Sequence, residues 1–138
     1  LFAELAAGGL AVAHNGNLTN GLTLRRELIA QGCICQSTSD TEVVLHLVAR
    51  STKVRLIDRY IEALRQLEGA YAFVNLTNKK MIGARDPLGI RPLMLGKLGD
   101  AYILCSETCA LDIIGAKFVR EIENGEVVVV PLIVKKSA

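Results

Sequence analysis

The hydrophobic pattern of the chain changes its period near Gly69, and this change constrains the fold more than any other feature. Before Gly69, apolar residues recur at three- and four-residue spacings in three stretches, which predicts three helices. After it, short apolar runs separated by turn residues predict strands. Because helices cluster before strands instead of alternating with them, the sequence favours an α+β fold with antiparallel sheets. Two stacked sheets with helices outside fit the strand patterns.

The expected elements have recognisable boundaries. The first helix lies between Asn20 and Gly32, the second is capped by Ser39, and Glu42 at its third position completes a capping box. A third helix is expected over 54–67 and a short fourth one over 106–114. The expected strands are 70–76 and 80–84 as one hairpin, 93–96 and 101–105, and 118–122 and 126–131 as a last hairpin across 124–125.

Residues 9–20 add a strand in front of the helices. Leu10 to Ala13 form an apolar run bounded by glycines, and the run stops at Asn15-Gly16, a dipeptide typical of tight turns. The side-chain amide of Asn15 and the unhindered backbone N–H of Gly16 are donors that can converge on one oxygen atom, as in an oxyanion hole. On local sequence alone, a plain turn is the commoner meaning of this dipeptide.

Size and charge exclude several classes of protein. The 138 residues fit one domain, and 51% hydrophobic residues supply a core, which argues against disorder. The 16 basic and 14 acidic residues leave a net charge of +2 and are spread along the chain, so no basic block indicates nucleic acid as a partner. No apolar stretch is long enough for a membrane helix. Small molecules or proteins are the expected partners.

The four cysteines predict neither a metal site nor a disulfide framework. They stand at positions 33, 35, 105 and 109, without the two-residue gaps typical of zinc knuckles or redox motifs. In an extended segment, Cys33 and Cys35 point to opposite faces, which argues against their binding one ion together. We therefore expect reduced thiols, no metal, and a cytoplasmic location.

Three further polar residues are candidates for chemistry. Asp40 stands at the start of the second helix, where backbone N–H groups keep a carboxylate ionised. It can bind a substrate ammonium, or it merely supports the helix start. His14 and His46 are interpreted as structural, because no nucleophile elbow accompanies either of them.

The segment 85–92 is rich in charges and turn residues. Arg85, Asp86 and Arg91 are expected to form a charge-assisted network that fixes a loop restricted by two prolines. Phosphate binding is the alternative. The structural role is favoured, because no glycine-rich phosphate motif precedes a helix here.

Four segments together resemble one enzyme family. They are His14-Asn15-Gly16-Asn17-Leu18-Thr19-Asn20, Ser37-Thr38-Ser39-Asp40-Thr41-Glu42, Arg85-Asp86-Pro87-Leu88-Gly89-Ile90-Arg91-Pro92-Leu93 and Cys105-Ser106-Glu107-Thr108. In this order and spacing they are similar to the class II glutaminase domain of the glutamine phosphoribosylpyrophosphate amidotransferases, or amidophosphoribosyltransferases. The resemblance covers nearly the whole chain. The glutaminase domains of asparagine synthetase and glucosamine-6-phosphate synthase are the nearest alternatives.

The resemblance implies an N-terminal-nucleophile fold, a four-layer αββα sandwich with two antiparallel sheets, of which residues 1–138 form the C-terminal portion. It implies that Asn15 and Gly16 form the oxyanion hole for the attacked side-chain amide of glutamine. It also implies that Asp40 binds the α-ammonium of that glutamine. The segment 85–93 is a family signature, to which we assign a structural role.

The resemblance also says what the chain lacks. The family's nucleophile is an N-terminal cysteine, and an arginine binds the substrate carboxylate; both are expected upstream of Leu1. We therefore expect this chain alone to be inactive. We also expect the protein to form a homo-oligomer. Phosphoribosylpyrophosphate, magnesium and any iron–sulfur cluster are expected to bind an absent phosphoribosyltransferase domain, with no cofactor in this region. A non-catalytic binding or regulatory module of the same fold is the alternative from a different class.

Overall fold

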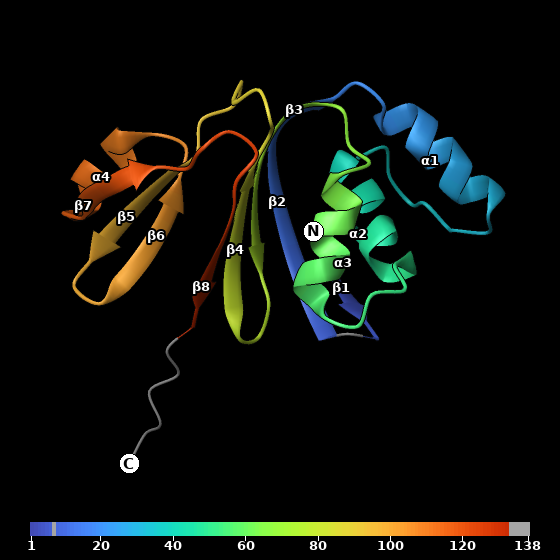
Figure 1. The fold of residues 1–138 in the computed structure, drawn as a ribbon, viewed down its shortest axis with the longest axis horizontal. Helices are drawn as coiled ribbons and strands as arrows, with labels where there is room; N and C mark the ends of the chain where they lie inside the picture. The colour runs from blue at the N-terminus through green and yellow to red at the C-terminus, as the bar shows by residue number, and fades with distance from the viewer. Residues whose placement is uncertain (7, 133–138) are drawn as a thin grey trace, which may run out of the picture.

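The structure is a computed structural model that describes residues 1–6 and 8–132, and Figure 1 shows two antiparallel sheets and four helices. The α+β class predicted from the sequence is confirmed. The elements are β1 (Phe2–Leu5), β2 (Gly8–Leu18), α1 (Gly21–Ala30), α2 (Asp40–Arg50), α3 (Leu56–Leu64), β3 (Gly69–Leu76), β4 (Lys80–Arg85), β5 (Met94–Leu98), β6 (Ala101–Cys105), α4 (Thr108–Ile114), β7 (Lys117–Glu121) and β8 (Val127–Pro131). None of the helices described is long and apolar enough to cross a membrane.

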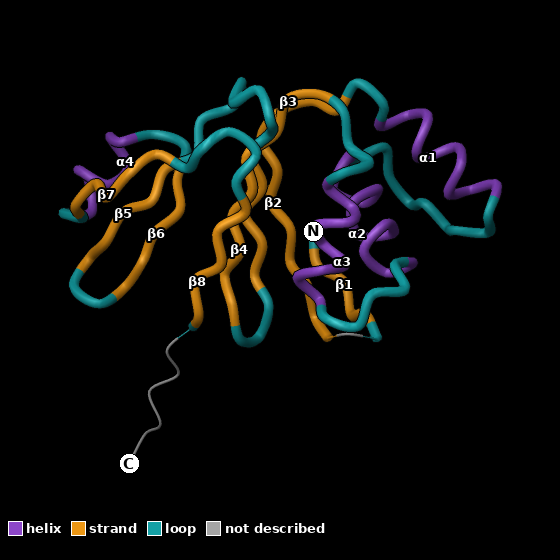
Figure 2. The backbone as a smooth tube through the Cα atoms, viewed as in Figure 1, coloured by secondary structure: helices purple, strands orange, loops and turns teal. Residues whose placement is uncertain are grey.

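The larger sheet has five strands in the order β1-β2-β3-β4-β8, and α1, α2 and α3 lie on one side of it (Figure 2). Strand alternation directs Val12 of β2, Phe73 of β3 and Ile82 of β4 into the core shared with these helices. Two valines of α2, Val44 and Val48, are completely buried there. Burial of this apolar surface is the main stabilising contribution to this half of the molecule.

One buried polar side chain interrupts this core; its amide nitrogen is hydrogen-bonded there, while its Oδ1 has no hydrogen-bond partner among the described residues. Asn75 of β3 is completely buried, and its side-chain amide donates to the hydroxyl of Tyr60 at 2.6 Å and to the carbonyl of Ile82 at 3.2 Å. These bonds tie α3 to β3 and β4. A polar side chain in this position therefore fixes the seating of the helix, because any shift of α3 would break a buried hydrogen bond.

The smaller sheet has the order β6-β5-β7 and packs against the other side of β3, β4 and β8. Val74 of β3 and Leu95 of β5 belong to the apolar cluster between the sheets. Gly83 allows a close approach, because a Cβ there would lie 2.8 Å from a methyl group of Leu104. On the opposite side of β5, Gly96 lies against a leucine of α4, so this helix covers the outer side of the small sheet.

Several boundaries predicted from the sequence are confirmed. The hairpin of β3 and β4, the start of α2 after Ser39, and the end of α4 at Gly115 all agree with the structure. The third helix is shorter than expected, at Leu56–Leu64. β1 was not predicted; it pairs with β2 antiparallel, with Phe2 opposite Ala11.

Three local predictions are wrong. Asn15-Gly16 is not a tight turn, because β2 continues through it to Leu18 and pairs with β3 along this length. The capping box does not form, because the Glu42 carboxylate accepts bonds from the preceding loop, while the Ser39 hydroxyl accepts from the N–H of Thr41. A glutamate three residues after a cap has more than one set of donors within reach.

The predicted last hairpin is the third error. β7 pairs with β5 in the small sheet and β8 pairs with β4 in the large one, so the chain crosses between sheets at residues 122–126. The Ile122 carbonyl accepts a bond from the Arg85 guanidinium, and the N–H of Gly125 donates to the backbone carbonyl of Asp86. These long-range bonds redirect a segment whose local sequence looks like a simple turn.

Candidate functional site

The candidate site lies where the end of β2 meets the first turns of α1 and α2. The carboxylate of Asp40 accepts a hydrogen bond from the backbone N–H of Leu18 at 3.2 Å. It also lies against the start of α1, because a Cβ on Gly21 would be 2.7 Å from its other oxygen. Asp40 thus joins segments that are about 20 residues apart in the sequence.

Local sequence explains how Asp40 is presented. Ser39 has an extended backbone and caps α2, which makes Asp40 the first residue of that helix. The N-terminal end of a helix carries partial positive charge, which attracts a negatively charged group at this position. Asp40 is partly buried, and its Oδ1 accepts no hydrogen bond from the described residues. One oxygen therefore anchors the side chain while the other is available to a cationic ligand.

Gly16 occupies a backbone conformation that only glycine adopts easily. Its φ is +134°, and a Cβ at this position would collide with the backbone carbonyl of Ala70 on β3. A second glycine with positive φ, Gly69, lies opposite Leu18 on the same ladder. Glycines at these two positions let β2 and β3 approach closely at the end of the sheet that carries Asp40.

Asn15 is exposed on β2, and its side chain makes no hydrogen bond to another residue in the described ranges. Its amide donors are therefore free to bind a ligand. The structure brings the three predicted residues to the same end of the large sheet: Asn15 and Gly16 stand on the strand, and Asp40 is bound to Leu18 two residues further on. Their assignment to one substrate remains a prediction.

His14 precedes Asn15 on β2 and belongs to the same region. Its ring stacks on Phe73 with centroids 4.7 Å apart, and its Nε2 is buried without a hydrogen-bond partner among the described residues. Burial lowers the pKa of His14 below its ordinary value, while the negative charge of Asp40 opposes this shift. The only signal in the sequence was its position beside Asn15.

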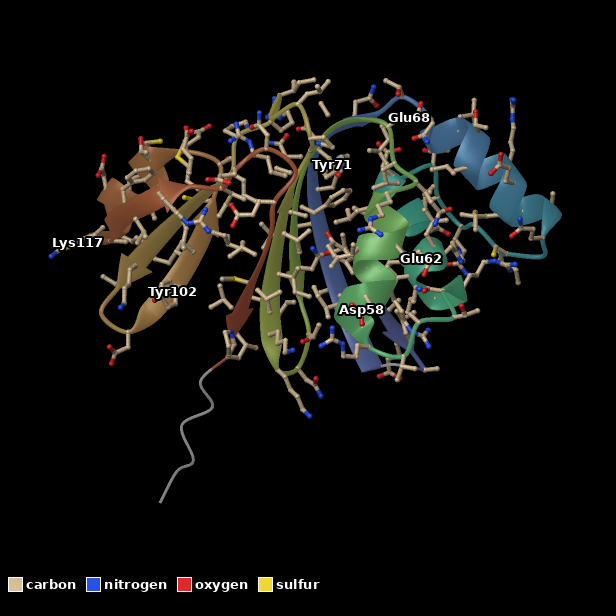
Figure 3. The ribbon with its side chains drawn as sticks, viewed as in Figure 1. Asp58, Glu62, Glu68, Tyr71, Tyr102 and Lys117 are labelled. Carbon is tan, nitrogen blue, oxygen red and sulfur yellow. The ribbon has the colours of Figure 1, made fainter. Side chains whose placement is uncertain are left out.

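Asn20 fixes the entrance to α1. It is the N-cap residue, but its side chain does not cap the helix. It donates instead to the carbonyl of Gln66 at 2.8 Å and accepts from the N–H of Glu68 at 2.9 Å. Figure 3 shows Glu68 beside the start of α1 and Tyr71 further along β3. The segment between α3 and β3 is thereby held against the end of β2.

The loop after β4 has a different character. Asp86 is completely buried and accepts hydrogen bonds from the N–H groups of Tyr71, Leu88, Ile90 and Arg91 at 3.0–3.3 Å. Arg85 donates to the carbonyls of Gly89, Arg91 and Ile122 at 2.7–2.9 Å. In the described part of the chain, these two charged groups bind backbone instead of each other. The arrangement supports a structural role for this segment.

The cysteines lie elsewhere. Cys33 packs against the helical core and receives a bond from Arg50, and Cys35 lies in the loop between α1 and α2. Cys105 and Cys109 both contact Glu107, and the hydrogen bond from Cys109 to the Glu107 carboxylate raises the pKa of that thiol. A raised pKa does not favour a nucleophilic thiolate at neutral pH.

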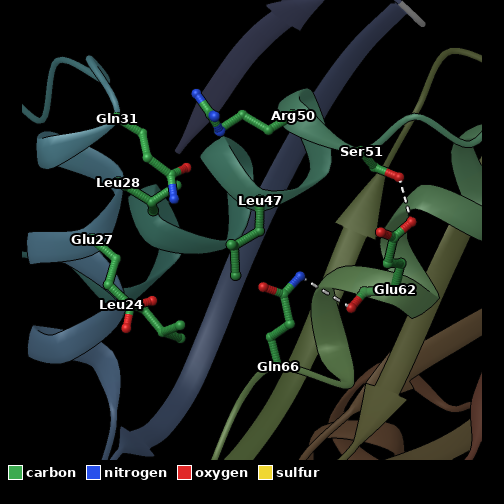
Figure 4. Close-up of a pocket in the computed structure, with 9 residues that line it drawn as sticks. All are labelled: Leu24, Glu27, Leu28, Gln31, Leu47, Arg50, Ser51, Glu62 and Gln66. Carbon is green, nitrogen blue, oxygen red and sulfur yellow. Dashed lines mark hydrogen bonds between the residues drawn. The ribbon is translucent and has the colours of Figure 1, made fainter.

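A hollow of about 190 Å³ lies between α1, α2 and α3 (Figure 4). Its polar lining is partly satisfied internally, because the Ser51 hydroxyl donates to the Glu62 carboxylate at 2.7 Å and the Gln66 amide donates to the Glu62 carbonyl. The lining residues include neither Asn15, Gly16 nor Asp40. This hollow is separate from the candidate site.

Known proteins share this fold and sequence. A family model described as a glutamine amidotransferase domain matches residues 2–112. The amidophosphoribosyltransferase of Rhizobium etli is 66% identical over 129 residues, which cover 94% of this chain and 26% of that protein. The enzyme of the same name from Bacillus subtilis is 49% identical over 94% of this chain and 27% of its own length. The chain therefore spans about a quarter of the length of these curated relatives.

A solved structure agrees with these sequence matches. The glutamine phosphoribosylpyrophosphate amidotransferase of B. subtilis, in complex with ADP and GMP, superimposes with a TM-score of 0.92 and 48% sequence identity. The match covers 95% of this chain and 29% of that one. The two antiparallel sheets and four helices described above match that enzyme's structure.

Proposed function

The chain belongs to the family of glutamine amidotransferase domains, and on this premise we propose that it is the C-terminal portion of the class II glutaminase domain of an amidophosphoribosyltransferase. The parent protein would hydrolyse glutamine to glutamate and ammonia. It would then transfer the ammonia to phosphoribosylpyrophosphate in the first step of de novo purine synthesis. The observation that carries this proposal is Asp40, held at the end of β2 with an oxygen left for a ligand.

Asp40 would bind the α-ammonium of glutamine. Its anchored oxygen fixes the carboxylate through Leu18, and the side chain lies in the first turn of α2. A hydrogen bond between a carboxylate and an ammonium is stronger than one between neutral groups. Glutamine bound in this way would extend along the end of β2.

Asn15 and Gly16 would then stabilise the reaction at the other end of the substrate. Attack on the side-chain amide places negative charge on its oxygen, and the Asn15 amide and Gly16 N–H would donate to that oxygen. Loss of one such donor in a hydrolase typically costs about 10²–10³ in kcat. The rigid ladder beside Gly16 supports this role, because donors that are already positioned need no reorganisation during the reaction.

Following the N-terminal cysteine that the family resemblance implies, we assign the attacking thiol to a cysteine outside these 138 residues. The two sheets with helices on their outer sides would form part of the four-layer sandwich of N-terminal-nucleophile hydrolases. A cytoplasmic homo-oligomer is proposed for the parent. Magnesium and any iron–sulfur cluster would bind other parts of the parent protein.

The experiment is an acceptor assay on the full-length protein that contains this chain. Glutamine-dependent glutamate release that supports phosphoribosylamine formation from phosphoribosylpyrophosphate is the expected result. Transfer to aspartate or fructose 6-phosphate would instead indicate an asparagine synthetase or glucosamine-6-phosphate synthase type. No glutamate release with any acceptor would indicate a non-catalytic module of the same fold.

Two variants assign the residues. We expect Asp40→Asn to raise KM for glutamine at least tenfold, because it removes the charge that binds the ammonium, and Asn15→Ala to lower mainly kcat. Both should retain synthesis from free ammonia, which bypasses the glutaminase site. Asp100→Asn and Asn78→Ala, exposed at turns in the two sheets, are the matched controls. If a variant lost the ammonia-dependent reaction as much as the glutamine-dependent one, the substitution would have damaged the fold and not the glutaminase site.

A further inference from the structure

Three side chains able to bind a metal meet at the start of α2. Cys35 comes from the loop after α1, and Glu42 and His46 are four residues apart on α2, which places them on the same face of the helix. A sulfur, a carboxylate oxygen and a ring nitrogen from these residues all lie within 4.8 Å of one another. All three residues are partly buried.

The surrounding loop holds two of these groups in place. The Glu42 carboxylate accepts hydrogen bonds from the N–H groups of Gln36 at 2.6 Å and Ser37 at 2.8 Å. The Nε2 of His46 lies 3.1 Å from the carbonyl oxygen of Ile34 and 3.7 Å from the Glu42 carboxylate, and a metal bound at Nε2 would replace the hydrogen bond to Ile34. Hydrogen bonds that orient carboxylate ligands are a regular feature of metal sites.

We propose that Cys35, Glu42 and His46 form a binding site for a divalent transition metal of the zinc class. Tetrahedral zinc places its nitrogen and oxygen ligands about 2.0–2.2 Å from the ion, so these ligands are separated by about 3.3–3.6 Å. The observed distance of 3.7 Å between Nε2 of His46 and Oε1 of Glu42 is close to this separation between ligand atoms. A thiolate together with an imidazole selects zinc, cobalt or copper over magnesium or calcium.

Sequence spacing hides this cluster. Cys35 and His46 are separated by half of the loop before α2 and by nearly two turns of that helix. Cys33, which is close to Cys35 in the sequence, packs on the core and not in this cluster. Three protein ligands leave a fourth position for water or another small ligand. A bound ion would link the loop to α2 within one helical turn of Asp40. This inference does not depend on the proposed glutaminase function.

Cobalt titration of the purified, reduced chain tests the proposal. Co²⁺ bound to a thiolate gives a sulfur-to-metal charge-transfer band in the near ultraviolet, which we expect to saturate at one equivalent. Cys35→Ser should abolish this band, and His46→Gln should weaken Co²⁺ binding at least tenfold. Cys109→Ser is the matched control, because Cys109 is an exposed thiol on α4 and should leave the band unchanged.

Thermal unfolding provides a second measurement that does not need a spectroscopic signal. Zn²⁺ should raise the Tm of the wild-type chain and of Cys109→Ser, and should raise that of Cys35→Ser markedly less, because a ligand that binds only the folded state stabilises it. Cys35 makes no hydrogen bond to a described residue, so this variant leaves the loop contacts intact. A charge-transfer band that persists in Cys35→Ser, or is absent from the wild type, would overturn the proposal.

Discussion

Two polar segments of this molecule use their charged groups in opposite ways. In the loop after β4, the Asp86 carboxylate accepts four backbone N–H groups and is completely buried. At the end of β2, Asp40 accepts one backbone bond and is only partly buried, and Asn15 nearby is exposed. The Asp86 carboxylate is fully used by backbone donors of its own molecule, whereas Asp40 and Asn15 retain hydrogen-bonding capacity for a ligand. Free capacity, more than charge, distinguishes a candidate site from a structural loop.

The Asp86 segment also explains how the two sheets are joined. Its side chain reaches the N–H of Tyr71 in the large sheet, and its backbone carbonyl accepts from Gly125 in the crossing segment. Arg85 completes the junction through the carbonyl of Ile122. A small number of buried charge-assisted hydrogen bonds therefore determines where the chain leaves one sheet for the other.

The largest effect is expected from Asp86→Ala. This change leaves four backbone N–H groups without their carboxylate acceptor, one from a buried and three from partly buried hydrogen bonds, and each buried unsatisfied donor costs about 1–3 kcal/mol. We expect a loss of about 4 kcal/mol in the free energy of unfolding, measured by urea denaturation. The exposed Asp100→Ala in the β5–β6 turn is the control and should change stability by less than about 0.5 kcal/mol. A stable Asp86→Ala protein would refute the structural assignment of this loop.

A smaller but clear effect is expected from Gly16→Ala. The new methyl group would meet the Ala70 carbonyl, and the positive φ is strained for alanine, so we expect a loss of about 2–3 kcal/mol. Gly8→Ala is the control for strain alone, because Gly8 lies on the same strand with a φ of +117° but has open space around it; about 1–2 kcal/mol is expected. Equal losses in the two variants, measured by urea denaturation, would show that the close approach of β2 and β3 is unimportant.

Local sequence was sufficient for most of the fold. The start of α2 at its Ser39 cap, the end of α4 at Gly115 and the β3–β4 hairpin follow from local sequence, because these features depend on neighbouring residues. Two of the three failures share one cause. Asn15-Gly16 and Asn124-Gly125 are both typical turn dipeptides, but β3 and the Asp86 junction, respectively, are remote in sequence and decide the conformation.

The candidate site divides in the same way. The position of Asp40 can be predicted because a capped helix start follows from local sequence, and its proposed role comes from the family resemblance. The sequence indicates a structural role for His14, because no nucleophile elbow accompanies it; its stacking on Phe73 and its proximity to Asp40 depend on packing between β2, β3 and α2, which local sequence does not specify. The meeting of Cys35 with His46 likewise depends on the path of a loop. Contacts across elements carry the information that periodicity lacks.

The smallest effect is expected from the titration of His14, which lies beside Asp40 and changes stability with pH. Because burial lowers the pKa of His14 below 6.5, the unfolded chain takes up a proton more readily than the folded one. This contribution to stability is fully present above pH 6.5 and is lost as the pH falls towards the folded pKa. Urea denaturation of His14→Gln should therefore show a weaker dependence on pH below 6.5 than the wild type.

Nuclear magnetic resonance measures the same titration directly. The chain has two histidines, so the ring resonance that disappears in His14→Gln identifies His14. Its midpoint should lie below 6.5, and Asp40→Asn should lower it further, because the Asp40 charge favours the protonated ring. Asp86→Asn serves as the control, since Asp86 is not among the groups that shift this histidine. If the titration midpoint of His14 changed in Asp86→Asn and not in Asp40→Asn, the distinction between an available carboxylate at Asp40 and a fully used one at Asp86 would be wrong.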